Sequence, residues 1–394
     1  MEHSRAAPKR PTSRDPRAVT AYLDHAATTP MRPEAIEAML PFLGADFANP
    51  SGIHAGARRA RRAVDRAREA LAGAVGCEPD EVVWTSGGTE SDNLALRGAH
   101  LVQGGDVLVS SVEHRAVLRP AAALGARVLA VTGDGQVDLA TLEAALSPAV
   151  RLVSVMGVNN EVGVQQPIRE IAALVRERAP QALLHCDAVQ AFPWLDVAEL
   201  CASCDLVSLS AHKFGGPKGV GALVVRRAGE RRLAPLLLGG PQERELRAGT
   251  ENVAGIVAAA VAAEATVRER AATVVRVAAL RDQLVDGLRA AWPAAVEVAP
   301  RALRVAGSAH LCFPGVEAEE LVLLLDAAGV AASTGSACAS GAREASHVLL
   351  AMGCSMQRAR ASVRFSLGAT STSAEITHAL AVVPRALARL SGSD

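Results

Sequence analysis

The stretch Ser208-Leu-Ser-Ala-His-Lys-Phe-Gly-Gly-Pro-Lys-Gly219 places Lys213 directly after a predicted strand. Residues 205–210 alternate apolar and small polar side chains, which is typical of a strand, and a Gly-Gly-Pro break follows the lysine. Among 41 basic residues, only Lys9, Lys213 and Lys218 are lysines. Arginine stays protonated and cannot act as an amine nucleophile. Lys213 is therefore the predicted attachment point for a carbonyl compound, and the simpler alternative is a surface lysine after a strand.

Composition favours an α/β protein packed by Ala, Val and Leu. Half of the 394 residues are hydrophobic, only 3% are aromatic, and the formal net charge is zero. A neutral chain has no global basic field, so we expect no direct nucleic-acid binding. The apolar run 253–263 ends at Glu264, well short of a bilayer span, so we expect no membrane segment.

Strand and helix patterns alternate from residue 81 to residue 226, which predicts a mixed, mainly parallel sheet between helices. The predicted strands are 82–85, 106–111, 127–131, 152–158, 182–187, 206–210, 221–226, 310–313 and 363–367. The predicted helices are 31–43, 57–75, 92–100, 116–124, 139–146, 168–178, 253–268, 274–291, 317–328 and 374–390. Residues 86–91 are predicted to form a turn.

These elements predict one large and one small domain. Residues 1–20 form an Arg- and Pro-rich leader that we expect to be disordered. Residues 21–32 are an N-terminal segment associated with the small domain, and residues 33–270 are the large, ligand-binding domain. Residues 271–394 form a smaller C-terminal α/β domain.

Seven cysteines, an odd number, in a long chain argue against a disulfide framework. No apolar signal segment follows Met1, so a reducing cytoplasm is the expected location. Cys201 and Cys204 have a CxxC spacing, but no second ligand pair is evident, so a zinc or redox role is the lesser alternative. The remaining cysteines in apolar settings are predicted to be core or near-core, namely Cys77, Cys186, Cys312 and Cys354.

Polar clusters follow successive predicted strands, where ligands collect in α/β sheets. Together they suit pyridoxal phosphate, which needs a lysine for its aldehyde, an anion for its ring nitrogen, a flat neighbour and a phosphate cradle. Lys213, Asp187 and His114 supply the first three roles. The cradle is predicted from Thr89, Ser210 and His212, with backbone N–H groups of the small-residue turn at 86–91.

Eight stretches in order give the chain its resemblance to a known family over residues 21–390. They are Tyr22-Leu-Asp-His-Ala-Ala-Thr-Thr-Pro30, Thr85-Ser-Gly-Gly-Thr-Glu-Ser-Asp-Asn93, Val158-Asn-Asn-Glu-Val-Gly163, His185-Cys-Asp-Ala-Val-Gln190, Ser210-Ala-His-Lys213, Arg247-Ala-Gly-Thr-Glu-Asn252, Thr334-Gly-Ser-Ala-Cys338 and Val363-Arg-Phe-Ser-Leu-Gly368. The chain resembles the cysteine desulfurases among the class V aminotransferase-like, fold-type I pyridoxal-phosphate enzymes. These enzymes make persulfide for iron–sulfur clusters and thiolated tRNA.

The resemblance implies a role for each matched residue. Lys213 would hold the cofactor, Asp187 would pair with the ring nitrogen, and His114 would stack on the ring. Gln190 and Asn160 would reach the cofactor's phenolic oxygen and the substrate side. The implied phosphate ligands are Gly88, Thr89, Ser210 and His212, joined by Thr250 from the other subunit of a homodimer.

The substrate residues follow from the same resemblance. Arg364, with Asn49, would grip the substrate carboxylate, because arginine binds carboxylates through two N–H groups. Cys338, in a Gly-, Ser- and Ala-rich loop, would be the nucleophile. L-cysteine would displace Lys213 to form an external aldimine, and Cys338 would take its sulfur as a persulfide, leaving alanine. The persulfide would pass to an acceptor protein, either an iron–sulfur scaffold or a tRNA-thiolation enzyme.

Two alternatives stay open at this point. One is a selenocysteine lyase or another class V enzyme, and the other is a non-catalytic scaffold that keeps the cofactor fold. The chain also departs from the family pattern, with Pro241 and Glu245 where glycines are usual, Gly157 where histidine is frequent and Ala345 where proline is common. These differences bear on loop mobility and partner choice.

Overall fold

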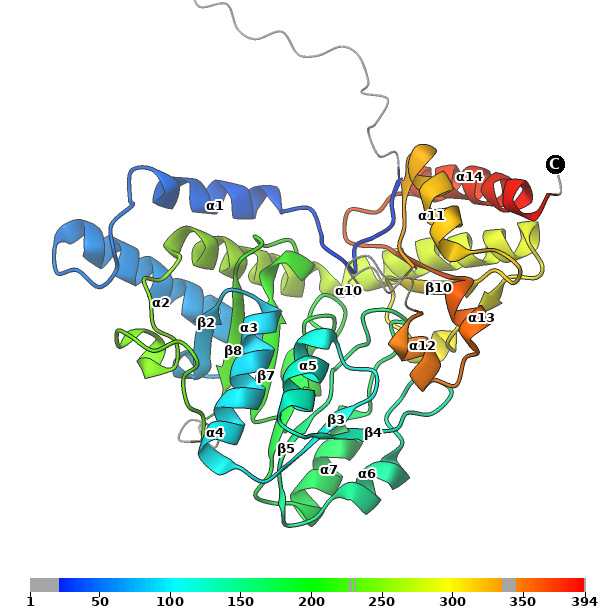
Figure 1. Ribbon diagram of the computed structural model, residues 1–394. Helices are drawn as coiled ribbons and strands as arrows, with labels where there is room; N and C mark the ends of the chain where they lie inside the picture. Colours follow the sequence, from blue (N-terminus) through cyan, green and yellow to red (C-terminus); the bar gives the residue numbers. More distant parts are fainter. Residues whose placement is uncertain (1–20, 227–228, 230–231, 335–344, 393–394) are drawn as a thin grey trace, which may run out of the picture.

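The computed structural model describes residues 21–226, 229, 232–334 and 345–392 (Figure 1). Its largest sheet has seven strands in the order β2-β8-β7-β6-β5-β3-β4. Their bounds are β2 Val82–Thr85, β3 Asp106–Ser110, β4 Arg127–Leu129, β5 Val150–Ser154, β6 Leu183–Asp187, β7 Leu206–Ser210 and β8 Gly221–Val225. Only β8 runs antiparallel to its neighbours, β2 and β7. The predicted mixed, mainly parallel sheet is confirmed.

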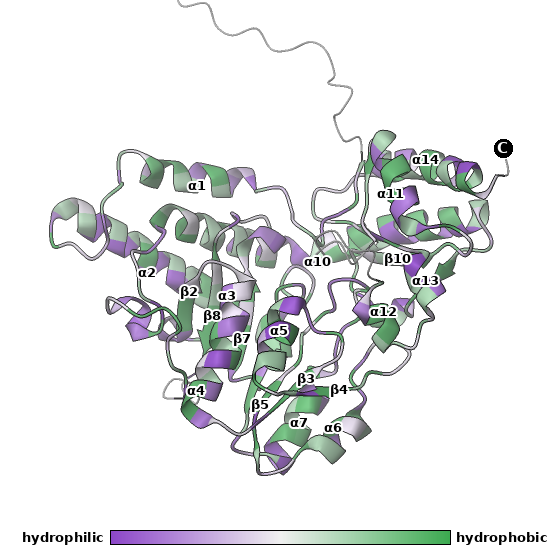
Figure 2. Ribbon diagram, in the orientation of Figure 1, coloured by the Kyte–Doolittle hydropathy of each residue, from purple (hydrophilic) through white to green (hydrophobic). Residues whose placement is uncertain are grey.

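Apolar side chains alternate between the two faces of this sheet, so each face packs against its own helices. Val82 and Trp84 belong to one core cluster, whereas Val83 between them belongs to the other. The first cluster includes residues of α2 (Ala55–Val75), α7 (Ile168–Arg178) and α10 (Val253–Ala291). The second includes residues of η2 (Leu94–Gly98, a π-helical turn), α4 (Ala99–Gln103) and α5 (Arg115–Ala123). The strands are accordingly hydrophobic along most of their length (Figure 2).

The other helices of the large sheet region are short or lie at its rim. They are α1 Pro33–Leu43, η1 Pro79–Glu81, α3 Gly88–Asn93, α6 Leu139–Ala145, α8 Val197–Leu200, η3 Ala211–Lys213 and η4 Gln242–Glu245. The prediction of a turn over residues 86–91 was wrong in its second half, because α3 already begins at Gly88. The chain turns from β2 into α3 at Gly87, whose φ of 151° is accessible to glycine but strained for other residues.

Helix α10 corrects the prediction of two separate helices over 253–268 and 274–291. It is one helix of 39 residues, capped at its start by the Asn252 side chain, which accepts the Gly255 N–H. The intervening residues 269–273 contain no glycine or proline, so the helix continues through them. Its first half packs in the large-sheet core, and its second half packs in a separate C-terminal core.

The C-terminal core surrounds a three-stranded antiparallel sheet in the order β12-β10-β9. The elements that follow α10 along the chain are β9 Val296–Glu297, η5 Arg301–Leu303, β10 Ser308–Cys312, α11 Ala318–Ala327, β11 Val330–Ala331, α12 His347–Ala351, α13 Met356–Arg360, β12 Ser362–Ser366 and α14 Ser373–Ser391. The first described strand, β1 (Ala21–Tyr22), pairs in parallel with β11. The start of the described chain therefore lies beside its C-terminal part (Figure 1). Among the helices of the described residues, none has both the length and the apolarity to cross a membrane.

Candidate active site

The carboxyl ends of β3, β5, β6 and β7 meet at one edge of the sheet, because these four strands are mutually parallel. His114 follows β3 and Asn160 follows β5. Asp187 ends β6, and Lys213 lies in the short helix directly after β7. The fold thus brings together residues that are spread over a hundred positions of sequence.

Lys213 is held by an N-terminal segment, residues 24–30. Its Nζ donates to the carbonyl oxygens of Ala26 at 2.5 Å and Ala27 at 2.8 Å. The Gln190 side chain donates to the same Ala26 carbonyl at 2.7 Å. Lys213 and Gln190 therefore share an acceptor, and the segment covers one side of the lysine.

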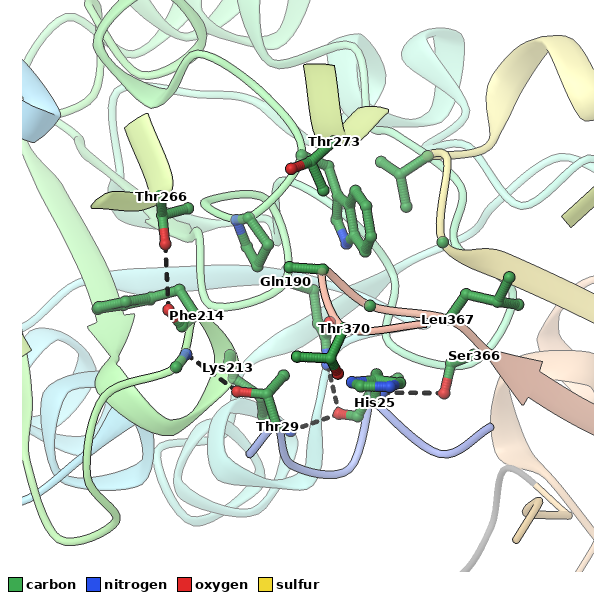
Figure 3. A pocket seen from close by; sticks show the side chains of 18 of the residues that line it. His25, Thr29, Gln190, Lys213, Phe214, Thr266, Thr273, Ser366, Leu367 and Thr370 are labelled. Atoms are coloured by element: carbon green, nitrogen blue, oxygen red, sulfur yellow. Dashed lines mark hydrogen bonds between the residues drawn. The ribbon is translucent and has the colours of Figure 1, made fainter. Parts of the chain in front are cut away.

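The residues of this contact, Ala26, Gln190 and Lys213, also line a cavity of about 290 Å³ (Figure 3). Three of the predicted site residues line it, namely Asn160, Gln190 and Lys213, together with His25 and Thr29 of the N-terminal segment. The residues predicted to hold the cofactor ring, His114 and Asp187, do not line this cavity. The cavity is thus a chamber next to the predicted cofactor position.

Asp187 is a buried carboxylate next to a cation. It is 5% exposed, and its Oδ1 accepts the Val189 N–H at 3.0 Å. Burial raises the pKa of Asp187 to about 6, while the charge of Lys213 opposes the rise. A buried carboxylate of this kind is stabilised by a cationic partner.

Below Asp187, His185 connects β5, β6 and β7. Its Nδ1 lies 2.8 Å from Ser154 Oγ, and its Nε2 lies 2.9 Å from Ser208 Oγ. Burial lowers the pKa of His185 to about 3, so the ring is neutral at physiological pH. The Asp92 carboxylate lies 3.7 Å from the same Nε2 and is itself buried. This polar layer was missed from sequence, although Asp92 and His185 both lie inside quoted motifs.

His114 is the N-cap of α5, and this fixes its tautomer. Its Nδ1 accepts the Ala116 N–H at 3.1 Å, so the neutral ring carries its hydrogen on Nε2. Burial lowers the pKa of His114 to about 4, and the charge of Lys213 lowers it further. A neutral ring with a fixed orientation can stack on a flat ligand.

The turn between β2 and α3 lies against β7. A side chain at Gly88 would come within 2.9 Å of Val189 and 3.5 Å of Ser210 Cβ, so glycine allows this close approach. Backbone N–H groups at a helix start attract anions, and the Thr89 side chain is exposed beside them. His212, one residue before the lysine, pairs with Thr28 Oγ1 at 3.1 Å. Gly88 and Ser210 thus lie close together, and the phosphate cradle of Gly88, Thr89, Ser210 and His212 stays a prediction.

Arg364, on β12, brings the C-terminal sheet to the site. Its guanidinium donates to the Asn160 carbonyl at 2.8 Å and to Asp24 Oδ1 at 2.7 Å, and the residue is 4% exposed. Asp24 was missed, because nothing in a sequence shows that residues 340 positions apart form an ion pair. Asn49 and Thr250 are exposed on loops, and the Asn49 side chain accepts the N–H of Ser51 in its own loop.

The predicted nucleophile, Cys338, lies outside the described residues, as do its neighbours from 335 to 344. The chain enters this stretch from Thr334 and leaves it at Ala345. Just before this stretch, the Ser333 N–H donates to the Arg364 carbonyl at 3.1 Å, and the Arg364 N–H donates to the Ser333 carbonyl at 2.7 Å. The loop therefore starts next to the predicted carboxylate-binding arginine.

Comparison with known proteins agrees with this geometry. The aminotransferase class-V family model matches residues 21–378. The chain is 41% identical over 377 residues to the cysteine desulfurase IscS of Dictyoglomus turgidum, covering 94% of this chain and 95% of that one. It is 43% identical over 384 residues to the IscS-like cysteine desulfurase of Mycobacterium tuberculosis, covering 94% and 96%. A solved NifS-like protein superposes with a TM-score of 0.89 at 32% identity, covering 94% of this chain and all of that one.

The fold and the strand-end residues therefore define an α/β, fold-type I enzyme. More specifically, the chain belongs to the class V aminotransferase family and, within it, to the cysteine desulfurases of the IscS type.

Membership of this family implies pyridoxal phosphate, and the residues present fit that cofactor. The fit can be tested by comparing the chemical groups of these residues with those that the cofactor needs. A primary amine, a buried carboxylate, a neutral imidazole and a small-residue turn at a helix start converge at one sheet edge. Lys213, Asp187, His114 and the turn at Gly88 would hold the aldehyde, ring nitrogen, ring face and phosphate, respectively.

Proposed function

We propose that this chain removes the sulfur of L-cysteine and leaves L-alanine, with the sulfur held as a persulfide on Cys338. Bound pyridoxal phosphate supplies an aldehyde for the amine and a ring that withdraws electrons from the carbons of the amino acid. Each residue of the site has one task in this reaction.

Arg364 orients the substrate. Its guanidinium is nearly buried and positively charged, and it can bind a carboxylate through two parallel N–H groups. Asp24 Oδ1 already accepts one N–H of this guanidinium, so the substrate carboxylate has to share or replace that hydrogen bond. Asn49 is the proposed second contact to the carboxylate.

Lys213 and His114 handle protons. Lys213 moves the proton at the α-carbon of the substrate once its amine is released. His114, neutral with its hydrogen on Nε2, keeps the flat ligand in place and can donate from Nε2. Asn160 and Gln190 line the cavity beside Lys213 and complete the polar surroundings of the cofactor and substrate.

Cys338 captures the sulfur. Its thiolate attacks the substrate sulfur, the Cβ–S bond breaks, the S–S bond forms, and a proton takes the place of sulfur on Cβ. One thiol and one cysteine thus give one persulfide and one alanine, with no external oxidant or reductant.

The observation that carries this proposal is the placement of Lys213. Its charge acts on both Asp187 and His114, which the sequence assigns to the two other contacts of the cofactor ring. A surface lysine or a scaffold without chemistry has no need for this arrangement.

The test is an assay of purified protein for alanine and sulfide formed from L-cysteine with a reductant. Cys338→Ser should abolish sulfide release while the absorbance of the bound cofactor remains, and Lys213→Ala should remove that absorbance. Cys354→Ser, at a half-buried cysteine that makes none of the site contacts described above, is the matched control and should keep both. Full turnover by Cys338→Ser would refute the nucleophile assignment, and absence of both products in the parent protein would refute the function.

We further propose a homodimer in which Thr250 reaches the phosphate of the other subunit. Large apolar side chains are exposed in the loop of Asn49 and in the loop before η4, with Ile53 90% and Leu238 84% exposed, as an interface would require. Light scattering on a sizing column should give twice the chain mass of 40.6 kDa. The persulfide would then pass to an acceptor protein, either an iron–sulfur scaffold or a tRNA-thiolation enzyme. We also propose that the chain divides into a large domain, residues 33–270, and a small domain, residues 271–394.

A further inference from the structure

Three of the seven cysteines meet in the core of the large sheet region. Cys186 lies on β6, and Cys201 and Cys204 lie in the turn that follows α8. All three are 1% exposed or less, and their sulfur atoms all lie within 4.8 Å of one another. The CxxC pair, which has no second ligand pair in sequence, thus gains a third thiol from a neighbouring strand.

This spacing is close to that of thiolates around one metal ion. With metal–sulfur bonds of about 2.3 Å, three thiolates sharing an ion lie about 4 Å apart. Side-chain adjustments of about 1 Å or less therefore close the site without moving the backbone. A disulfide needs only two thiols, so it does not account for the third.

Backbone contacts hold the turn in position and place two cations beside it. The Cys204 N–H donates to the Cys201 carbonyl at 3.0 Å. Arg226 Nε donates to the Cys204 carbonyl at 3.1 Å, and Arg176 donates to the Ser203 carbonyl at 2.9 Å. The turn is thus flanked by two guanidinium groups and by the Asp205 carboxylate, which pairs with Arg176 at 2.8 Å.

Cys204 lies one layer below solvent, because the two residues before it, Ala202 and Ser203, are exposed.

The surroundings offer no fourth ligand among the described side chains. The only metal-ligating group of three or more found there consists of these cysteines. A side chain built at Gly157 would meet Ala191 at 3.1 Å, Leu200 at 3.2 Å and the Cys186 sulfur at 3.3 Å, so this side of the cluster is apolar and closed. Structural zinc takes four ligands, and Mg²⁺ and Ca²⁺ take oxygen.

We propose that Cys186, Cys201 and Cys204 form a binding site for one cuprous ion, held by three sulfur atoms. Soft thiolate ligands select Cu⁺, and a monovalent soft ion accepts three-coordinate geometry in an apolar pocket. Binding releases thiol protons to solvent and transfers no electrons. The site does not depend on the proposed desulfurase reaction.

The test uses the full-length holoprotein in a Cys338→Ser background, so that the reactive thiol contributes nothing. Cu⁺ is supplied anaerobically as a coloured cuprous chelate, and loss of the chelate's absorbance reports transfer to the protein. We expect one Cu⁺ per chain and at least a tenfold loss of affinity in Cys186→Ala and in Cys201→Ala. The matched control, Cys312→Ala with Cys354→Ala, removes two cysteines of another core cluster and should retain the ion.

X-ray absorption of the copper-loaded parent protein keeps the proposal testable if a core variant does not fold. Three sulfur neighbours at one distance support the site. Two sulfur neighbours, oxygen or nitrogen ligands, failure to take Cu⁺ from the chelate, or equal retention by Cys186→Ala would overturn it. Desulfurase activity of the unmodified chain, measured separately, has no bearing on these outcomes.

Discussion

Glu113 offers the sharpest test of the electrostatics below the active site, through the substitution Glu113→Gln. This carboxyl is fully buried directly before His114. Its Oε1 accepts the Ser110 hydroxyl at 2.6 Å and the Met156 N–H at 2.8 Å, whereas its Oε2 has no partner among the described residues. Burial raises the pKa of Glu113 from 4.5 to about 8, and the nearby Asp187 raises it further.

The sign of the effect follows from proton linkage. Between pH 4.5 and 8 the folded protein keeps the proton of Glu113, whereas the unfolded chain has lost it. Unfolding therefore releases a proton, and the stability from this group falls as pH rises, by up to about 1.4 kcal/mol per pH unit. Over the whole interval the loss is at most about 5 kcal/mol, and relaxation around the charge reduces it.

Glutamine keeps the Oε1 acceptor, resembles the protonated acid and cannot ionise. We expect Glu113→Gln to match the parent within about 1 kcal/mol at pH 5 and to exceed it by at least about 2 kcal/mol at pH 8. Urea unfolding of both proteins in the same cofactor state, at half-unit steps of pH, measures the difference. The half-exposed Glu143, changed to Gln, is the control and should show a flat difference. Parallel stability curves for Glu113→Gln and the parent would refute the reasoning.

Three further outcomes are expected. Glu243→Gln should lower the free energy of unfolding by about 3 kcal/mol, because the buried carboxylate accepts two N–H groups of Arg68 at 2.9 and 2.7 Å; an unchanged urea midpoint would contradict this. Glu245→Gly should raise the free energy of unfolding by up to about 1 kcal/mol, because Glu245 has a φ of 64°, where glycine is unstrained. A clear decrease of this free energy in the same urea experiment would show that Glu245 is not strained. Arg364→Lys should raise the KM for L-cysteine at least about tenfold with a smaller change in kcat, because lysine cannot bind a carboxylate through two parallel N–H groups. An unaltered KM in a steady-state assay of alanine formation would exclude the proposed carboxylate contact.

The large sheet was predictable because each strand carries its own signal. Short apolar runs followed by small or polar residues mark β3, β5, β6 and β7, and parallel pairing then sends their carboxyl ends to one edge. Lys213, Asp187 and His114 could be placed together from these two facts alone. The family pattern added which atoms of a cofactor each of them would face.

Helix boundaries and the loop before Thr250 were harder to predict. The apolar run 253–263 ends within α10, but the helix continues and only passes from one core to the other. At Glu245 the family's glycine preference did signal a special backbone, and the structure has three consecutive residues with positive φ there, from 243 to 245. The buried pairing of Glu243 with Arg68 stabilises this strained turn, and no local pattern shows it.

The residues that close the site were invisible for a different reason. Asp24 binds Arg364, the Ala26 and Ala27 carbonyls bind Lys213, and Thr28 binds His212. Residues 24–28 thus contact both the predicted carboxylate-binding arginine and the predicted cofactor lysine, through partners 184 to 340 positions away. Two of these four contacts use backbone carbonyls, which every residue has, so the amino-acid types along this segment carry only part of the signal. The parallel pairing of β1 with β11, which involves two residues of each strand, and the bridge between Asp24 and Ser366 fix its path.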